Sequence, residues 1–340
     1  MMKAAVFSGP GRVELVDLPV PVPGPEEVLV RVHYCGICGS DLEAYHTGIY
    51  EPGLVIGHEF AGEVAAVGEK VERWAEGDRV TVNDALPCGR CLYCGRKMPT
   101  LCEDLIMPGV THNGGMAEYV LVPQEALHLL PDTVTTRKGA LVEPLAVALH
   151  GVKRSAMKAG DPVLVVGAGP IGLLTLKSAF LAGAREAYLS EMDSTRAAMA
   201  LKLGASKVFD PSRHNLALEL NSCTNGEGPS VVYVCTGATA AFEEAVTLVR
   251  KGGQIMVLGV AVEPVATDFL TVVLHELEIR GSYLGYDQFD PAMEYIARDE
   301  VDVEALVSSE IGLEEVVERG FEMLETPGSG AIKILVKLIT

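Results

Sequence analysis

Short apolar runs, interrupted by Gly and Pro residues, dominate the first 150 residues of the chain. Runs of about four to eight residues with such boundaries are typical of β-strands. The first part of the chain is therefore predicted to be mostly β. The strands that we predict there are 3–7, 27–32, 62–68 and 78–82.

The pattern changes at Asp161, after which short apolar strands alternate with segments of helical periodicity. Such alternation is typical of a parallel, doubly wound sheet with helices on its faces. The tail from residue 290 holds two short helical patterns and ends in an apolar segment, 331–338, that we expect to be a strand. The predicted strands before the tail are 163–166, 186–190, 207–210, 231–235, 254–259 and 277–283, and the predicted helices are 169–184, 194–205 and 241–249.

Length and composition agree with an α/β protein of two domains. At roughly 150 residues per domain, a chain of 340 residues forms about two. The net charge of −19 argues against nucleic acid or an anionic membrane as a partner. Gly-rich turns, Pro170 and Lys177 interrupt the most apolar stretch, 162–184, so we do not expect it to span a membrane. The opening residues turn polar within a few positions, unlike a secretory signal, and we expect a cytoplasmic protein.

A glycine-rich turn predicts a dinucleotide site. Gly167, Gly169 and Gly172 form a G-x-G-x-x-G at the junction of a predicted strand and helix. In that context the glycines turn the chain, let a pyrophosphate approach and pack helix against strand, whereas an isolated match is an ordinary tight turn. Glu191, at the end of the next strand, can accept hydrogen bonds from ribose hydroxyls and repel a 2′-phosphate, which favours NAD. Asp193 is the competing acid, but we expect it to cap the helix that begins at Ser194.

Four of the eight cysteines lie within residues 88–102, a segment that we call the cysteine lobe. Four closely spaced thiolates make a closed tetrahedral zinc site, which contributes to folding and leaves no position for substrate. Iron–sulfur ligation is an alternative, and disulfides are disfavoured in a reducing compartment. The other motifs favour structural zinc on the ligands Cys88, Cys91, Cys94 and Cys102.

A second group of metal-ligating residue types is dispersed along the chain: Cys38, His58, Glu59 and Glu143. None of them has diagnostic spacing when taken alone. Cys38 fits a buried thiol, His58 a turn residue and Glu143 a capping acid before Pro144. Whether these four residues bind a metal ion must be judged from the motifs around them.

Those motifs resemble the medium-chain dehydrogenase/reductase superfamily. The stretch GHEFAGEVAAVGEKV matches its zinc-site signature, G-H-E-x2-G-x5-G-x2-V, at Gly57, His58, Glu59, Gly62, Gly68 and Val71. The segments CGICGSD, EGDRV, GGMAEYV and VEPLAVALHG also follow in the family's order. Within the superfamily the chain is most similar to the polyol dehydrogenase branch, which includes sorbitol and butanediol dehydrogenases.

The resemblance implies a fold and a division into domains. A GroES-like, mostly β catalytic domain would comprise residues 1–145 and 285–340 and hold both zinc ions. A Rossmann domain, residues 146–284, would bind NAD. Related enzymes are commonly homodimers or homotetramers that act on small molecules.

The resemblance also implies a catalytic zinc at Cys38 and His58, with Glu59 and Glu143 sharing the remaining coordination and one position left open. Zinc would lower the pKa of the bound alcohol. Ser40 would take its proton, and the alkoxide would expel hydride to the nicotinamide. Glu43 stands where familiar alcohol dehydrogenases have a histidine that passes the proton on, and nearby His46 fits a surface residue.

The expected cofactor contacts extend beyond the glycines and Glu191. Arg196 matches a family position near the adenine. Leu284 aligns with an arginine that binds sugar hydroxyls in sorbitol dehydrogenases, which favours small alcohols or vicinal diols over hexitols. Residues Tyr45, Ile49 and Tyr50 fit either an apolar substrate pocket or ordinary loop packing. The remaining expected cofactor contacts are Pro170, Ile171, Leu258, Gly259, Val260, Ser282 and Tyr283.

The sequence thus predicts a zinc-dependent, NAD-linked enzyme that oxidises a secondary alcohol, vicinal diol or polyol to the ketone, and the reverse. A threonine dehydrogenase-like oxidation of an amino alcohol is an alternative. Two others are a zinc-free quinone or enone reductase, which would not need Cys38, His58 and Glu143, and a non-catalytic NAD-binding protein, in which Ser40 would be idle. We expect structural roles for Cys35, Cys223, Cys235 and His150.

Overall fold

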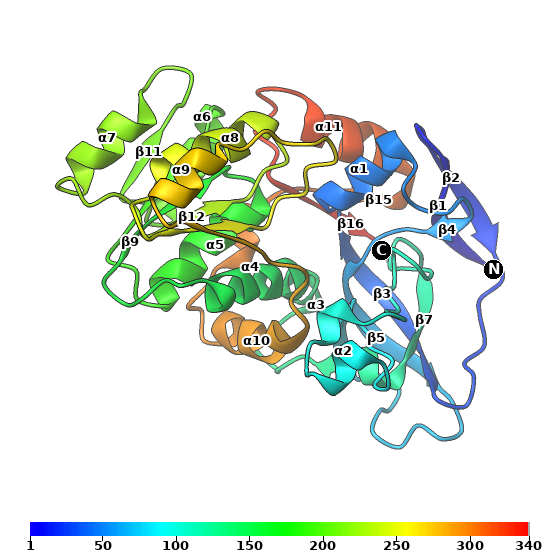
Figure 1. Cartoon of the computed structure of the whole chain (residues 1–340). Coiled ribbons are helices and arrows are strands. Elements are labelled where there is room, and N and C mark those ends of the chain that lie inside the picture. Colours follow the sequence, from blue (N-terminus) through cyan, green and yellow to red (C-terminus); the bar gives the residue numbers. More distant parts are fainter. Residues whose placement is uncertain (339–340) are drawn as a thin grey trace. The chain divides into compact units, whose positions relative to one another are not determined.

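The computed structural model describes residues 1–338, which form two compact units (Figure 1). Within the described residues, unit 1 comprises 1–146 and 284–338, and unit 2 comprises 147–283. Helix α4 (Val142–Arg154) begins in unit 1 and ends in unit 2. Among residues 1–338, no helix combines the length and apolar character needed to cross a membrane.

Unit 1 is built on two β-sheets. The predicted strands 3–7, 27–32, 62–68 and 78–82 are confirmed in β1, β3, β5 and β6. The smaller sheet has the order β2-β1-β4 and the larger has β15-β16-β3-β5-β6-β8, with β7 also paired to β3. The strands are β1 (Met2–Gly9), β2 (Arg12–Leu18), β3 (Glu27–Gly36), β4 (Leu54–Val55), β5 (Glu59–Val67), β6 (Arg79–Val82), β7 (Tyr119–Pro123), β8 (Leu127–Leu129), β15 (Val307–Gly312) and β16 (Lys333–Lys337).

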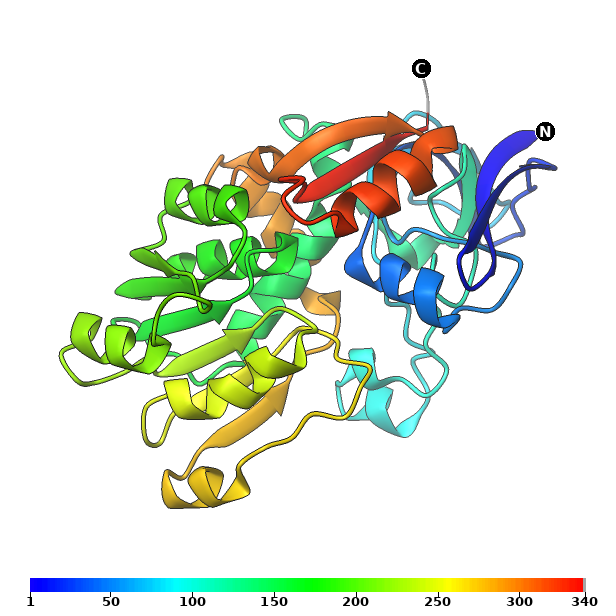
Figure 2. The same cartoon turned by 90° about the horizontal axis from the view of Figure 1, so that it is seen from above.

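The last strand of unit 1 enters the middle of its larger sheet. Strand β16, which the sequence predicted, pairs antiparallel with β3 on one side and parallel with β15 on the other. Figure 2 shows β15 and β16 side by side, in orange and red. The sequence did not predict β15, because two Ser residues and a Glu occupy its middle and leave no apolar run.

The helices of unit 1 are short. Two residues separate helix α1 from the end of β3, and the position of this helix matters for the site described below. The two helical patterns expected in the tail are confirmed in α10 and in the π-helical segment Val316–Phe321 that continues into α11. The bounds are α1 (Gly39–Thr47), α2 (Leu92–Gly95), α3 (Thr136–Gly139), α10 (Phe289–Ala297) and α11 (Glu322–Glu325).

Helix α1 and the loop that follows it pack into the core of unit 1. Tyr50 is buried, and its ring meets Phe7 edge-on at 6.3 Å between centroids. The ring of Tyr45 meets Phe321 in the same way at 5.2 Å. Ile49 is exposed. Of the two interpretations of this loop, the contacts of the tyrosines therefore match ordinary loop packing.

Unit 2 contains a six-stranded parallel sheet in the order β11-β10-β9-β12-β13-β14. This is the strand order of a doubly wound Rossmann sheet, in which the order reverses beside the first strand. The predicted fold class, a GroES-like β domain with a Rossmann domain, is thus confirmed. The strands are β9 (Pro162–Val166), β10 (Glu186–Ser190), β11 (Lys207–Phe209), β12 (Val231–Val234), β13 (Gln254–Val257) and β14 (Glu278–Gly281).

The helices of unit 2 fall into two packed groups. Helices α5 and α6 contact one another, as do α7 with α8 and α8 with α9. The sequence did not predict α7 or the six-residue α9, whose segment FLTVVL is rich in residues that favour strands. The bounds are α5 (Pro170–Leu181), α6 (Ser194–Lys202), α7 (Leu216–Cys223), α8 (Thr239–Leu248) and α9 (Phe269–Leu274).

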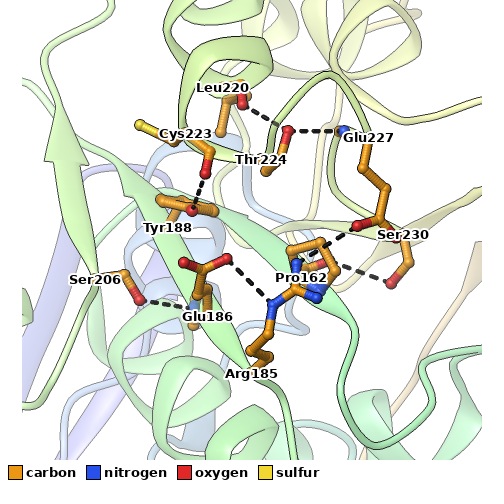
Figure 3. Close-up of polar contacts among 12 residues, drawn as sticks. Pro162, Arg185, Glu186, Tyr188, Ser206, Leu220, Cys223, Thr224, Glu227 and Ser230 are labelled. Atoms are coloured by element: carbon orange, nitrogen blue, oxygen red, sulfur yellow. Dashed lines mark hydrogen bonds and ion pairs between the residues drawn. The ribbon is translucent and has the colours of Figure 1, made fainter.

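Side-chain hydrogen bonds join the connections of unit 2 to its strands (Figure 3). The hydroxyl of Ser230 donates to the carbonyl of Pro162, at the start of β9, and Tyr188 donates to the carbonyl of Cys223. Thr224 donates to Leu220 and so closes the end of α7. Because the glycine-rich turn follows the carboxyl end of β9, the Ser230 bond lies at the opposite end of that strand.

Three cysteines outside the metal-ligand groups have structural surroundings, as the sequence predicted. Cys35 is fully buried in the core of unit 1, and burial raises the pKa of its thiol well above the ordinary value. Cys235 lies 3.7 Å from the hydroxyl of Thr175, and Cys223 packs against the core of unit 2. All eight cysteines are free thiols.

Candidate metal and cofactor sites

Cys38, His58 and Glu59 lie together in unit 1, and we call these three residues the mixed donor set. One ligand atom from each lies within 4.8 Å of the others. The pairing of β3 with β5 brings them together, because Gly36 at the end of β3 is the register partner of Glu59. Cys38 is half-buried as the N-cap of α1, whereas His58 and Glu59 are buried.

Asp41, which sequence reasoning missed, lies beside two members of the mixed donor set. One carboxylate oxygen, Oδ2, accepts a hydrogen bond from the amide of Cys38 at 3.0 Å. The other, Oδ1, lies 3.7 Å from Nδ1 of His58. Asp41 stands three residues after the N-cap of α1, where an acid closes a capping box. This three-residue spacing from Cys38 was the signal in the sequence from which Asp41 could have been identified.

Lys333 is a second residue of this site that sequence reasoning missed. It is buried on β16, and its Nζ donates to Oε2 of Glu59 at 2.5 Å and to the carbonyl of Ile37 at 2.8 Å. A lysine is almost never fully buried unless it is paired. The signal in the sequence was a lysine inside the apolar segment that forms the last strand, but nothing local identifies its partner.

Glu143 lies outside the mixed donor set but belongs to the same electrostatic cluster. It is buried in the first turn of α4. Burial raises its pKa well above the ordinary value, and the negative charges of Asp84 and Glu59 add to the effect. Asp84 was not singled out from the sequence; burial raises its pKa to about 6, with His58 acting in the opposite direction. Oδ1 of Asp84 is buried without a hydrogen-bond partner.

The charges around the mixed donor set suit a divalent cation. Burial alone would lower the pKa of His58, but the negative charges of Cys38 and Asp41 raise it well above the ordinary value. His58 Nδ1 and Asp41 Oδ1 are buried without hydrogen-bond partners. A sulfur, an imidazole nitrogen and a carboxylate oxygen are ligands that zinc prefers, and three protein ligands are typical of a catalytic site. The residues therefore fit zinc with one open position.

Ser40 lies in the first turn of α1, two residues after Cys38, and is half-buried. Glu43 is half-buried farther along the same helix. His46 is exposed, and its Nε2 lies 2.6 Å from Oε1 of Glu325, so the prediction of a surface histidine is confirmed.

The cysteine lobe gathers all four of its thiols. The four sulfur atoms lie within 4.8 Å of one another, and each cysteine is half-buried. The amide of Cys88 donates to the sulfur of Cys102 at 3.2 Å, and the amide of Cys94 to that of Cys91 at 3.5 Å. The backbone N–H groups of Cys94 and Glu103 lower the pKa of Cys91 to about 6. Burial and the Cys91 side chain raise the pKa of Cys94 to about 12, and a bound metal ion would deprotonate such a thiol.

The glycine-rich turn joins β9 to α5. Gly167 has φ +97°, which favours glycine, and a Cβ on Gly172 would lie 1.8 Å from the carbonyl oxygen of Gly167. A Cβ on Gly169 would meet no atom within 4 Å, so open space lies beside the residue that caps α5. Pro170 and Ile171 begin the helix. This arrangement fits a pyrophosphate at a helix N-terminus.

Glu191 follows β10 and is tied to the glycine-rich turn. Its Oε2 accepts a hydrogen bond from the amide of Ala168 at 2.8 Å. Its Oε1 accepts from the amides of Met192 and Asp193, each at 2.8 Å. Asp193 caps α6, as predicted, by accepting from Thr195 and from the backbone of Arg196.

The other expected cofactor residues follow β13 and β14. Because β9, β13 and β14 belong to one parallel sheet, their carboxyl ends lie at one edge of it, where ligands of such sheets bind. A Cβ on Gly259 would lie 2.1 Å from the carbonyl oxygen of Thr236, so only glycine fits there. Leu284 has φ +59°, an uncommon conformation for a non-glycine residue. The residues at these ends are Leu258, Gly259 and Val260, and Ser282, Tyr283 and Leu284.

Known proteins resemble this chain along its whole length. The family model of the alcohol dehydrogenase GroES-like domain matches residues 24–132, and that of zinc-binding dehydrogenases matches 170–298. Sorbitol dehydrogenase of Bacillus subtilis is 32% identical, over 92% of this chain and 91% of its own. L-Threonine 3-dehydrogenase of Rhizobium rhizogenes is 33% identical, over 98% of each chain.

Solved structures of other proteins also resemble this chain along its whole length. A zinc-binding dehydrogenase of Sinorhizobium meliloti bound to NADP has a TM-score of 0.93 and 34% identity, with 99% of each chain covered. The 2R,3R-butanediol dehydrogenase of Bacillus subtilis has a TM-score of 0.90 and 33% identity, again with 99% of each chain covered. The chain therefore belongs to the zinc-binding dehydrogenase family, in the branch that resembles the polyol dehydrogenases. It is an oxidoreductase that acts on CH–OH groups.

Proposed function

We propose that this chain is a zinc-dependent, NAD-linked dehydrogenase that oxidises a small secondary alcohol or vicinal diol to the ketone and catalyses the reverse reaction. The observation that supports this most directly is the mixed donor set, whose three ligand atoms lie within 4.8 Å of one another. A zinc-free quinone or enone reductase would have no use for these buried ligands. The glycine-rich turn and Glu191 supply the features of a dinucleotide site.

Each residue of the site has a separate task in the proposed reaction. Zinc, when bound, acts as a Lewis acid on the alcohol oxygen. Cys38, His58 and Glu59 hold the ion, and Asp41 orients the loop that carries Cys38. Ser40 relays the hydroxyl proton of the substrate, since it takes up this proton as it releases its own to water. Glu143 provides a further carboxylate beside the site, either as a ligand in its own right or through a bridging water.

The cofactor is proposed to be NAD rather than NADP. Glu191 holds its carboxylate beside the glycine-rich turn through the amide of Ala168. A 2′-phosphate on the adenine ribose would bring a second negative charge to this carboxylate, and like charges at short distance repel. Arg196 lies on α6 nearby in sequence and is the cation that could lessen this repulsion. The structure of the Sinorhizobium meliloti relative holds NADP, so the cofactor preference of this chain is to be measured.

The substrate is proposed to be smaller and less polar than a hexitol. Leu284 stands where sorbitol dehydrogenases have an arginine, and its side chain has no hydrogen-bond donor. A buried hydroxyl that lacks a partner costs about 1–3 kcal/mol, so two such groups would weaken binding by on the order of 10²-fold. Threonine is the second candidate substrate, because the threonine dehydrogenase relative is as similar as the sorbitol dehydrogenase.

Initial rates with the zinc-loaded enzyme test these proposals together. We expect 2,3-butanediol and simple secondary alcohols to exceed sorbitol in kcat/KM by on the order of 10²-fold, with NAD preferred to NADP and activity lost after chelation. Equal rates with sorbitol would contradict the role given to Leu284, and a preference for NADP would contradict that of Glu191. Threonine as the best substrate would favour the amino-alcohol alternative. Reduction of a quinone by metal-free protein would contradict the zinc mechanism.

Two or four copies of the chain are proposed to associate through unit 2. Strand β14 lies at the edge of its sheet, and all four of its residues are exposed. Unpaired N–H and C=O groups on such a strand can pair with a second copy around a twofold axis. Exposed apolar side chains accompany the strand, at Phe269, Leu270, Val273, Leu274 and Ile279. Sedimentation of the intact protein checks this, and a monomer at micromolar concentration would contradict it.

The four thiols of the cysteine lobe also bear on the compartment. Thiolate ligands persist where the environment is reducing. We therefore infer a reducing compartment such as the cytoplasm.

A further inference from the structure

A fully enclosed lysine lies beside the mixed donor set although no step of the proposed reaction uses it. Its side chain is 2% exposed, and that of Glu59 is 1% exposed. Removing two charges from water is expensive, and a buried ion pair is weak support for stability alone. The position of Lys333 therefore calls for an explanation beyond the packing of β16.

The contacts of Lys333 join two parts of the metal site. One N–H donates to the carbonyl of Ile37, the residue before Cys38, and another donates to Oε2 of Glu59. The lysine thus connects the backbone that positions one ligand to the side chain of a second. Strand β16 carries it into place, because Leu335 on this strand pairs with Gly36 of β3.

The carboxylate of Glu59 is confined from two sides. Oε2 lies over the backbone of Gly36, where an added Cβ would come within 2.2 Å of it. The ammonium group of Lys333 holds the same oxygen at 2.5 Å. A carboxylate held in this way has one oxygen engaged by a positive charge before any metal ion enters the site.

We propose that Lys333 is a positioning residue that keeps Oε2 of Glu59 off the metal ion, so that Glu59 coordinates through no more than one oxygen and one coordination position stays open for substrate. This inference rests on the proposed zinc function. The ammonium group and the metal ion compete for the same carboxylate. Without the lysine, a buried and unpaired carboxylate would have the metal ion as its nearest source of positive charge.

The test uses cobalt in place of zinc, with no substrate present. Co²⁺ shows by its visible absorption how many ligands it has, and its bands weaken when a further ligand binds. In Lys333→Met we expect weaker absorption and slower removal of cobalt by a chelator, because Glu59 would supply both oxygens. Turnover of the zinc form should fall by about 10–100-fold, in kcat more than in KM. Lys333→Arg should restore the spectrum, since it restores the positive charge.

Lys337→Met is the matched control. Lys337 lies on the same strand, four residues farther along, and its side chain is exposed. We expect its spectrum, chelation rate and turnover to equal those of the unaltered protein. An unaltered cobalt spectrum in Lys333→Met, or faster loss of cobalt, would overturn the proposal and leave Lys333 with a structural role only.

A double variant keeps the test valid if Lys333→Met does not fold. Glu59→Gln removes the charge that the lysine neutralises, so Glu59→Gln with Lys333→Met leaves no unpaired buried charge. If Lys333 acts through Glu59, the double variant and Glu59→Gln alone should have the same cobalt spectrum, and different spectra would overturn the proposal. A wild-type protein that binds no cobalt would instead contradict the proposed function. Failure to oxidise alcohols with normal cobalt binding would leave the role of Lys333 intact.

Discussion

Replacement of His58 by Ala is expected to abolish alcohol oxidation while NAD binding stays nearly unchanged. The imidazole is one of three ligands in the mixed donor set, and its loss leaves Cys38 and Glu59 to hold the ion alone. Lewis-acid activation contributes several kcal/mol to such a reaction, and each 1.4 kcal/mol or so is about tenfold in rate. We therefore expect kcat/KM to fall by at least roughly 10³-fold.

Steady-state rates with 2,3-butanediol, together with fluorescence titration of NADH, measure both parts of this expectation. His46→Ala is the matched control, because that histidine is exposed and pairs with Glu325 on the surface. Its rates should stay within about twofold of the unaltered enzyme, as is usual for surface substitutions. Substantial activity in the His58 variant would show that the metal mechanism is wrong.

Replacement of Cys91 by Ser is expected to destabilise the protein far more than it alters the chemistry of the molecules that remain folded. The four sulfur atoms of the cysteine lobe form a closed set with no position for substrate. Loss of a structural metal belongs among the large destabilising changes, and about 3 kcal/mol would lower Tm by roughly 6–12 °C in a domain of 150–250 residues. The zinc content should fall from about two ions to about one per chain.

Calorimetry and metal analysis check this second expectation. Cys223→Ser is the control, since that cysteine packs against the core of unit 2 and lies outside both metal-ligand groups. It should retain both zinc ions. A Cys91 variant with normal melting and full zinc content would contradict a structural role for the lobe.

The features that could be predicted from the sequence depend on neighbours along the chain. The cysteine lobe spans residues 88–102, and the glycine-rich turn lies between one strand and the next helix, so short-range spacing describes both. Asp41 also lies within this range, but an acid near a helix start has many ordinary roles. The role of Asp41 at the metal site becomes clear only from the fold, because the pairing of β3 with β5 places His58 beside it.

Lys333 shows why the rest could not be predicted. It is separated from Glu59 by 274 positions in sequence, and their contact depends on β16 entering the sheet next to β3. No local pattern states which strand will be the neighbour of another. The same limit applies to Asp84, whose carboxyl gains its raised pKa from burial. The short helix α9 was not predicted for another reason. Its residues favour strands, but the side chain of Asp268 caps the helix by accepting hydrogen bonds from the amides of Leu270 and Thr271.

The order of strands in unit 1 has a consequence for how the protein is made. Unit 1 consists of two stretches of chain separated by the whole of unit 2, residues 147–283. A ribosome releases a chain from its amino end, so the first 146 residues emerge long before β16, the strand that pairs with β3 and brings in Lys333. Unit 2, a single continuous stretch, is available in full earlier. During synthesis, the mixed donor set therefore lacks its contact with Lys333 until β16 has been made.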